Sequence, residues 1–224
     1  MPFLGSAAML LSFDIAEGAI EEHDDWHTHE HLPERLSIPG FLRGTRWVAL
    51  HGGPRYVVLY EVAELATLTS AAYLERLNNP SPWTSKMMPH YRGMKRGLCS
   101  VSGSFGLGTG HVAKLLRFTP GEGAASLRAW LLEDALPSVV TQPGVGSAHL
   151  LESAAAPVMT NEQRIRGADA GVDWAVVLAG YREEALPSLA LNSKGARGVS
   201  EAYYRYDYSL ARGEGSINPR TGAA

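Results

Sequence analysis

The stretch that decides the fold is "WHTHEHLPERLSIPGF", residues 26–41, because the chain carries a second version of it, "WLLEDALPSVVTQPGV", at residues 130–145. The two stretches align without gaps. A tryptophan, a Leu-Pro pair and a Pro-Gly pair all recur 104 residues after their first occurrence. Three features that share one offset indicate an internal repeat. The sequence therefore predicts two copies of one structural unit.

Each copy has the pattern of elements of a ferredoxin-like unit. An apolar strand leads into a helix of about 15 to 18 residues that ends near the Pro-Gly pair, and two strands, a second helix and a last strand follow. This order is βαββαβ. The expected strands cover residues 7–15, 40–50, 55–62 and 97–105 in the first copy, and 111–119, 144–152, 173–181 and 203–211 in the second. The second helices are expected near residues 68–79 and 183–192, and about 14 extra residues fall within 152–171.

The domain boundaries follow from this repeat. Residues 1–107 form the first repeat and residues 108–212 the second, with the Gly-rich "GLGTG" at 106–110 as the join. That segment lacks the lysine of a phosphate-binding loop, so a linker is the simpler interpretation. The polar, Gly-rich residues 213–224 are expected to form a flexible tail.

Composition narrows the class of protein. Of the 224 residues, 45% are hydrophobic and 19% charged, which is typical of a globular chain. The formal net charge of -3, without a basic run, argues against nucleic acid as a partner. The single cysteine, Cys99, excludes an internal disulfide and fits a reducing compartment. No apolar stretch approaches the ~20 residues that span a bilayer, and the N-terminal apolar run lacks a basic flank, so we expect a first strand rather than a signal peptide. The expected location is the cytoplasm, with no membrane partner.

One motif resembles a known family. Trp26, His31, Pro33 and the Pro39-Gly40 pair spell W-x4-H-x-P followed by x4-I-P-G. This pattern is similar to the EthD-like branch of the dimeric α+β barrel superfamily, in which two ferredoxin-like units usually pair through their sheets. The resemblance implies an α+β fold in which the tandem copies form an intrachain pseudo-dimeric barrel. A homodimer of such pseudo-dimers is a further expectation.

The histidines of the first copy are the main candidate site. His23, His27 and His31 are four residues apart and share a helix face, whereas His29 points elsewhere and is expected in solvent. The offset of 104 maps the three onto Leu127, Leu131 and Ala135, an apolar face that must turn towards the sheet. If the two helices pack alike, three imidazoles point at the core of the first copy. Burying them costs roughly 1–3 kcal/mol each unless they find partners, which favours a polar pocket in the first copy and a solid second copy.

Two other interpretations of these histidines stay open. The helix can rotate and leave them at a wet edge, or bonded to backbone carbonyls. Alternatively, one pair could hold a metal ion with a third ligand from His51, Glu30 or Glu61. All three rings cannot share one zinc, because the outer two are about 12 Å apart along the axis, whereas two nitrogens on one zinc are at most ~4.2 Å apart. We predict no metal.

The resemblance also suggests roles for individual residues. Cofactor-free lactone isomerases of the superfamily carry one histidine eight residues before the Pro-Gly pair, here His31, and another near the end of the second strand, here His51. They also use a cysteine, and Cys99 is not in a matching place. A neutral imidazole can take a proton from carbon beside a carbonyl, or from a phenol, and return it elsewhere.

The remaining candidates would shape a pocket for a flat, apolar molecule. Aromatic and thioether side chains suit this task, although such residues are more often plain core. The substrate-binding candidates are His23, Trp26, Tyr56, Tyr60, Trp83 and Met87, with Met88 as a neighbour of the last. We expect His90, which follows Pro89 in a loop-like stretch, to be exposed, and we treat His111 and His149 as structural.

The sequence thus predicts a cofactor-independent enzyme acting on a small apolar or aromatic metabolite. The expected reaction is proton transfer of an isomerase, cyclase or lyase type, with His31 as base or acid, assisted by His27 and His51. The alternatives are a cofactor-free monooxygenase, a non-catalytic EthD-like binding or accessory protein of a catabolic pathway, and a metal-dependent enzyme.

Overall fold

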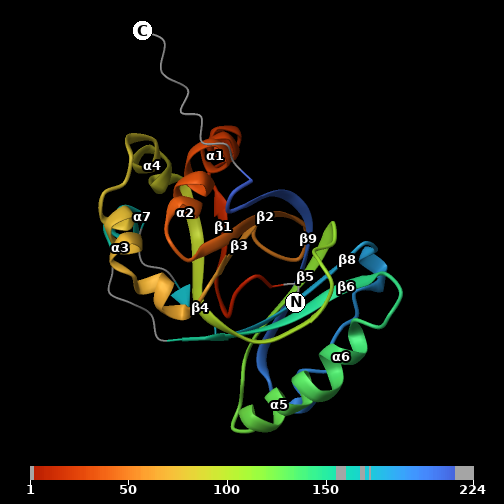
Figure 1. The fold of residues 1–224 in the computed structure, drawn as a ribbon. Coiled ribbons are helices and arrows are strands. Elements are labelled where there is room, and N and C mark those ends of the chain that lie inside the picture. Colours follow the sequence, from red (N-terminus) through yellow and green to blue (C-terminus); the bar gives the residue numbers. More distant parts are fainter. Residues whose placement is uncertain (1–2, 155–159, 167–169, 172, 215–224) are drawn as a thin grey trace.

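Eight strands close into an antiparallel barrel in the computed structural model, which describes residues 3–154, 160–166, 170–171 and 173–214 (Figure 1). They follow each other around the barrel in the order β1-β3-β2-β9-β5-β8-β6-β4, and a β1–β4 pairing closes the ring. The strands are β1 (Ala7–Ile15), β2 (Phe41–His51), β3 (Tyr56–Val62), β4 (Tyr91–Gly106), β5 (Val112–Thr119), β6 (Val145–Ser153), β8 (Trp174–Gly180) and β9 (Arg197–Ala211). The short β7 (Ala170–Gly171) pairs in parallel with β4. The α+β class is confirmed.

Helices cover the barrel on two sides (Figure 1). One group is α1 (Ile20–Trp26), α2 (Leu32–Ser37), α3 (Ala71–Asn78), α4 (Pro82–Met87) and α7 (Asn161–Arg166). The other group is α5 (Ala124–Trp130) and α6 (Leu136–Val139). A π-helical turn, His27–His31, joins α1 to α2, and a second, Leu131–Ala135, joins α5 to α6. The two turns lie 104 residues apart, which is the offset of the sequence motif.

The alternation of side chains along the strands divides the core into three parts. Residues such as Ala8 and Leu10 point into the barrel, while Met9 and Leu11 point out towards the helices. One buried cluster fills the barrel, a second lies under α1 to α4, and a third lies under α5 and α6. The candidate histidines lie in the same layer as the second cluster, between the helices and the outer face of the barrel. The orientation of the α1–α2 helix therefore determines which residues they contact.

The Pro-Gly pair has a conformational reason in both halves. Gly40 has φ of 91° and Gly144 has φ of 101°, values that a residue with a Cβ rarely adopts. Each glycine lets the chain leave the helix and turn at once into the next strand. The recurrence of this pair in the sequence therefore reflects the same helix-to-strand turn in both halves.

Two of the sequence predictions about helices had different outcomes. The helix expected near residues 68–79 is confirmed as α3, and the Ser70 side chain caps it by accepting a hydrogen bond from the Tyr73 amide at 3.3 Å. The prediction of a helix near residues 183–192 is wrong. That stretch has only short 3-10 turns, at Glu183–Ala185 and Asn192–Lys194. Pro187 lies in its middle, where it removes a helical hydrogen bond and clashes with the preceding turn.

The last strand of each half is longer than expected, and the extra segment is not a simple loop. The strand β4 starts at Tyr91 and β9 at Arg197. Within the extra residues 152–171, α7 forms and packs beside α3 of the first half. Of the expected tail, residues 215–224 lie outside the described residues. No helix in the described part of the chain is long and apolar enough to cross a membrane.

A first testable prediction concerns how closely α2 lies on the barrel. A Cβ added at Gly44 of β2 would come 2.3 Å from the Leu32 methyl carbon and 3.0 Å from the Tyr60 ring, and both side chains are fully buried. Gly44→Ala therefore forces α2 outwards, and we expect it to lower the free energy of unfolding by roughly 1–3 kcal/mol. Gly18→Ala is the control for chemical denaturation, because a Cβ there meets nothing within 4 Å. Equal stability of the two variants would contradict this packing.

Candidate functional site

The three histidines of the α1–α2 helix are buried, as predicted. His23, His27 and His31 are exposed by only 0%, 2% and 7%, whereas His29 faces solvent. The rings form a row in which the centroids of His23 and His27, and of His27 and His31, are each 5.6 Å apart. The π-helical turn carries the last two, and such turns occur frequently at functional sites.

The helix of the second half has the same π-helical turn but an apolar lining. At the corresponding positions Leu127 and Leu131 are fully buried, and Ala135 is partly buried and packs on the same cluster. The alkyl groups need no hydrogen-bond partner, whereas each imidazole does. The first half must therefore supply polar partners inside its core, and the next contacts show how it does so.

His27 is held in one tautomer. The guanidinium of Arg46 lies 3.3 Å from its Nδ1, and since arginine has no lone pair to offer, Nδ1 must be the acceptor. The proton is then on Nε2, which lies 3.4 Å from the Tyr60 hydroxyl. Burial, and after it the charges of His23 and Arg46, set the pKa of His27 well below its usual value. His27 is therefore a neutral ring whose basic nitrogen is already occupied, which suits positioning better than proton abstraction.

His23 has a carboxylate partner. Its Nδ1 lies 3.1 Å from Asp24 Oδ1, which also accepts a 2.7 Å hydrogen bond from the Tyr56 hydroxyl. Burial alone would raise the pKa of Asp24, but the hydrogen bonds from His23 and Tyr56 outweigh it, so the pKa is lowered. Burial lowers the pKa of His23 by more than Asp24 raises it. His23 is thus a neutral ring that donates to an anion at the outer end of the row, where the Asp24 side chain is 35% exposed.

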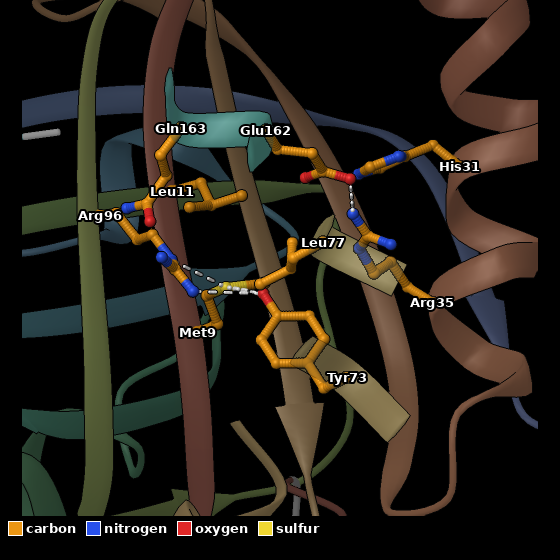
Figure 2. Close-up of a pocket in the computed structure, with 9 residues that line it drawn as sticks. All are labelled: Met9, Leu11, His31, Arg35, Tyr73, Leu77, Arg96, Glu162 and Gln163. Carbon is orange, nitrogen blue, oxygen red and sulfur yellow. Dashed lines mark hydrogen bonds and ion pairs between the residues drawn. The ribbon is translucent and has the colours of Figure 1, made fainter. Parts of the chain in front are cut away.

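His31 is the member of the row that lines a cavity. The cavity measures about 30 Å³, room for about two water molecules. It lies between α2, β1, α3, β4 and α7, and its lining is Met9, Leu11, His31, Arg35, Tyr73, Leu77, Arg96, Glu162 and Gln163 (Figure 2). The ring of His31 also packs on Trp26, with 4.4 Å between centroids. Only this histidine can meet a molecule that enters the cavity as it stands.

A buried ion pair closes one side of this cavity. The Arg35 guanidinium donates to Glu162 at 2.5 Å and to Glu34 at 3.0 Å. Glu162 comes from α7, so the extra segment of the second half supplies part of the site in the first half. Figure 2 shows the Glu162 carboxylate at the end of the Arg35 guanidinium, with the His31 ring beside it.

Several predicted pocket residues surround the histidines without lining the cavity. Tyr56 and Tyr60 are fully buried against His23 and His27, and Met87 lies fully buried in the same core cluster. The Trp26 indole donates to Glu30 at 3.1 Å and to Thr84 at 3.3 Å, while the half-buried Trp83 donates to Glu22 at 3.2 Å. These side chains pack around the imidazole row and hold it in place.

His51, which the sequence analysis expected to assist His31, is not among the residues that line the cavity. The strand β2 pairs with β9 of the second half, and this pairing places His51 opposite Tyr203. Its ring lies 4.5 Å from the Tyr203 ring, its Nε2 is 2.7 Å from Glu183, and its side chain is 57% exposed. His51 therefore does not overhang the cavity at His31.

The sequence reasoning missed the polar residues that complete the cavity. Arg35 follows His31 by one helical turn and could have been found by extending the histidine face. Arg96 precedes the strand predicted from residue 97, and Glu162 lies in the segment that has no counterpart in the first copy. Within the described residues, no group of three or more His, Cys, Asp or Glu side chains is arranged to hold a metal ion.

His149 gives the second testable prediction. It is buried on β6 between Ser104 and Ser147, and burial, with a smaller effect of Arg43, lowers its pKa to about 3. In the unfolded chain the pKa is about 6.5. Between these values the unfolded state binds a proton that the folded state excludes, so stability is full above pH 6.5 and falls as the pH drops towards 3. Linkage from His149 alone gives a loss of roughly 3 kcal/mol between pH 7 and pH 4.

Chemical denaturation at pH 7, 6, 5 and 4 measures this loss. The lowered pKa values of His23 and His27 act in the same direction. The variant His149→Gln should show a shallower decline by about one proton, and the exposed His111→Gln should reproduce the wild-type slope. Parallel curves for wild type and His149→Gln would show that His149 is not buried in its neutral form.

No protein-family model and no curated protein matches the chain, so the comparison rests on solved structures. An anthrone oxidase-like protein superposes with a TM-score of 0.64 at 9% identity, covering 96% of this chain and 97% of the other. A candidate monooxygenase from Fusobacterium nucleatum subsp. nucleatum ATCC 25586 gives 0.61 at 6% identity, with coverages of 93% and 96%. Another, from Lactobacillus acidophilus NCFM, gives 0.58 at 10%, with 93% and 97%.

The chain shares its overall α+β fold with these three structures. Identities of 6–10% show the shared fold and leave the reaction to be argued from the site.

Proposed function

We propose that the chain is a cofactor-independent enzyme that transfers a proton on a small, flat metabolite, with His31 as the base. The observation that carries this proposal is the asymmetry of the two halves. His31 ends a buried row of imidazoles and borders a polar cavity, while the same helix position in the second half is alanine in an apolar layer. Burying imidazoles in the core lowers the stability of the fold. A chemical role for the histidines would explain why the core contains them in place of alkyl side chains.

The chemistry follows from the roles that the contacts allow. In its neutral form the His31 imidazole accepts a proton from carbon next to a carbonyl, or from a phenol. The deprotonated substrate is an enolate or a phenolate. The guanidiniums of Arg35 and Arg96 on the cavity wall stabilise its negative charge. Return of the proton to another atom completes an isomerisation or cyclisation without an external oxidant. The hydrogen bond from Arg46 to His27 fixes the position of the helix turn that carries His31.

The two halves are, in this proposal, tandem ferredoxin-like repeats of an EthD-like protein, residues 1–107 and 108–212, that pair as a pseudo-dimer. The strand order supports it, because β4-β1-β3-β2 and β9-β5-β8-β6 are the same arrangement and meet at β2–β9 and β6–β4. The two π-helical turns, 104 residues apart, support it as well. The first repeat would carry the site and the second would serve as scaffold and supply Glu162.

A cofactor-free monooxygenase is the second candidate. It is favoured by the names of the similar solved structures and by the availability of the same base, His31. The similar structures include an anthrone oxidase-like protein and two candidate monooxygenases. A carbanion formed at His31 could react with O₂ directly. A methylene group would then become a carbonyl, with one oxygen atom in the product and the other released as water.

Anthrone is a suitable probe for both candidates, since it is a flat carbon acid with an activated methylene group. Under argon in D₂O, the enzyme should speed the exchange of the methylene protons, which NMR follows. Under air, oxygen uptake with formation of anthraquinone and water would identify the monooxygenase. Because the cavity holds only about two waters, binding requires the wall formed by Glu162 and Gln163 to move. Binding without exchange or oxygen uptake would favour an accessory binding protein and refute the proposed enzyme for this class of carbon acid.

A further inference from the structure

Arg96 lines the same cavity as His31, and the hydrogen-bond partners of its guanidinium among the described residues are neutral. It lies on β4 with a half-buried side chain. Its Nε donates to the Met9 sulfur at 3.4 Å and its Nη2 to the Tyr73 hydroxyl at 3.3 Å (Figure 2). Both acceptors are neutral and weak for a guanidinium, which prefers a planar pair of anionic oxygens.

The neighbouring arginine shows what a satisfied guanidinium looks like here. Arg35 binds Glu162 and Glu34. No carboxylate in the described part of the chain forms an ion pair with Arg96. Arg96 therefore brings a positive charge to the cavity wall that no described carboxylate pairs.

The second half pairs its charges at the same place in the sheet. Leu11 of β1 lies opposite Arg96, and Leu116 of β5 lies opposite Glu201. In the second half, Glu201 accepts a 2.6 Å ion pair from the fully buried Lys114. Among the described residues, the charge at this register position is thus paired with an opposite charge in the second half and not in the first.

We infer that the cavity binds an organic anion, and that Arg96 forms the ion pair with its carboxylate or deprotonated oxygen. This inference rests on the proposed function and names the charge of its substrate class: flat carboxylates, enolates and phenolates. The anionic group occupies the small cavity between Arg96 and His31. The rest of the ligand extends past α7.

Calorimetric titration with benzoate and salicylate, each compared with its neutral amide, tests this charge preference. We expect the wild-type protein to bind the anions roughly tenfold to a hundredfold more tightly than the amides, the range of one charged hydrogen-bonded pair. Arg96→Gln should abolish the preference, and Arg96→Lys should keep the charge but only part of the affinity. Lys95→Gln removes an exposed charge from the adjacent residue and should change nothing.

The outcomes separate this inference from the proposed function. An unchanged preference in a folded Arg96→Gln protein, or equal binding of anions and amides to the wild type, overturns the assignment of Arg96. His31→Gln should retain the preference for anions, since it removes the base and leaves the cation. If anions bind through Arg96 while no carbon acid exchanges its protons, the proposed catalysis fails and the anion site stands. Circular dichroism confirms that each variant is folded, and Arg96→Lys provides the comparison if Arg96→Gln is not.

Discussion

His31→Gln is expected to reduce the exchange of anthrone methylene protons to the uncatalysed rate, a loss of roughly 10²–10⁴-fold for removal of a general base. Glutamine keeps a polar group next to Trp26 but cannot accept and return a proton at neutral pH. His31 is 7% exposed and borders the cavity, so the substitution can be accommodated without a new void in the apolar core. We therefore expect a folded protein with near wild-type thermal stability.

His29→Gln is the matched control for this measurement. His29 lies in the same π-helical turn, faces solvent, and bonds only the Asp25 carbonyl at 2.9 Å in the described contacts. Its loss should leave exchange unchanged. Wild-type exchange by His31→Gln, with His29→Gln also active, would remove His31 from the mechanism. Loss in both variants would point to the turn itself rather than to one imidazole.

Much of the fold follows from features that are local in sequence. The two Pro-Gly pairs mark the helix-to-strand turns, which use Gly40 and Gly144. The apolar strands indicate a sheet that is buried on both faces. Both features can be predicted from the sequence pattern. The burial of the histidines was also visible, because the leucines 104 residues later mark the inward face. The helix expected near residues 183–192 does not form, because Pro187 lies in its middle and the interior of a helix does not tolerate proline.

The polar half of the cavity could not be predicted in the same way. Arg35 and Glu162 meet across 127 residues of sequence, and Glu162 lies in a segment that has no copy in the first half to compare with. Arg96 lies just before the strand predicted from residue 97, and only the longer strand β4 places it on the cavity wall. Periodicity reports which face of one element is buried, whereas a site made from several elements depends on long-range packing.

Arg35→Leu should produce the largest loss of stability. Arg35 is 1% exposed, and burial opposes its charge, but Glu162, Tyr73 and Glu34 outweigh that effect and raise its pKa. Removing the cation leaves Glu162 and Glu34 buried or half-buried without a partner. Breaking a buried pair in this way costs roughly 3–5 kcal/mol, a large part of the ~5–15 kcal/mol that stabilises a typical domain.

The exposed pair Arg128–Glu152 on the other side of the barrel provides the control. Arg128 is 45% exposed, and Arg128→Leu should cost at most about 1 kcal/mol, because solvent screens surface pairs. The double variant Arg35→Leu with Glu162→Leu should recover part of the loss, since it removes the uncompensated anion as well as the cation. Equal effects of Arg35→Leu and Arg128→Leu in chemical denaturation would mean that α7 does not bury this pair against the cavity. The second half would then contribute no residue to the site, and the cavity at His31 would be open on that side.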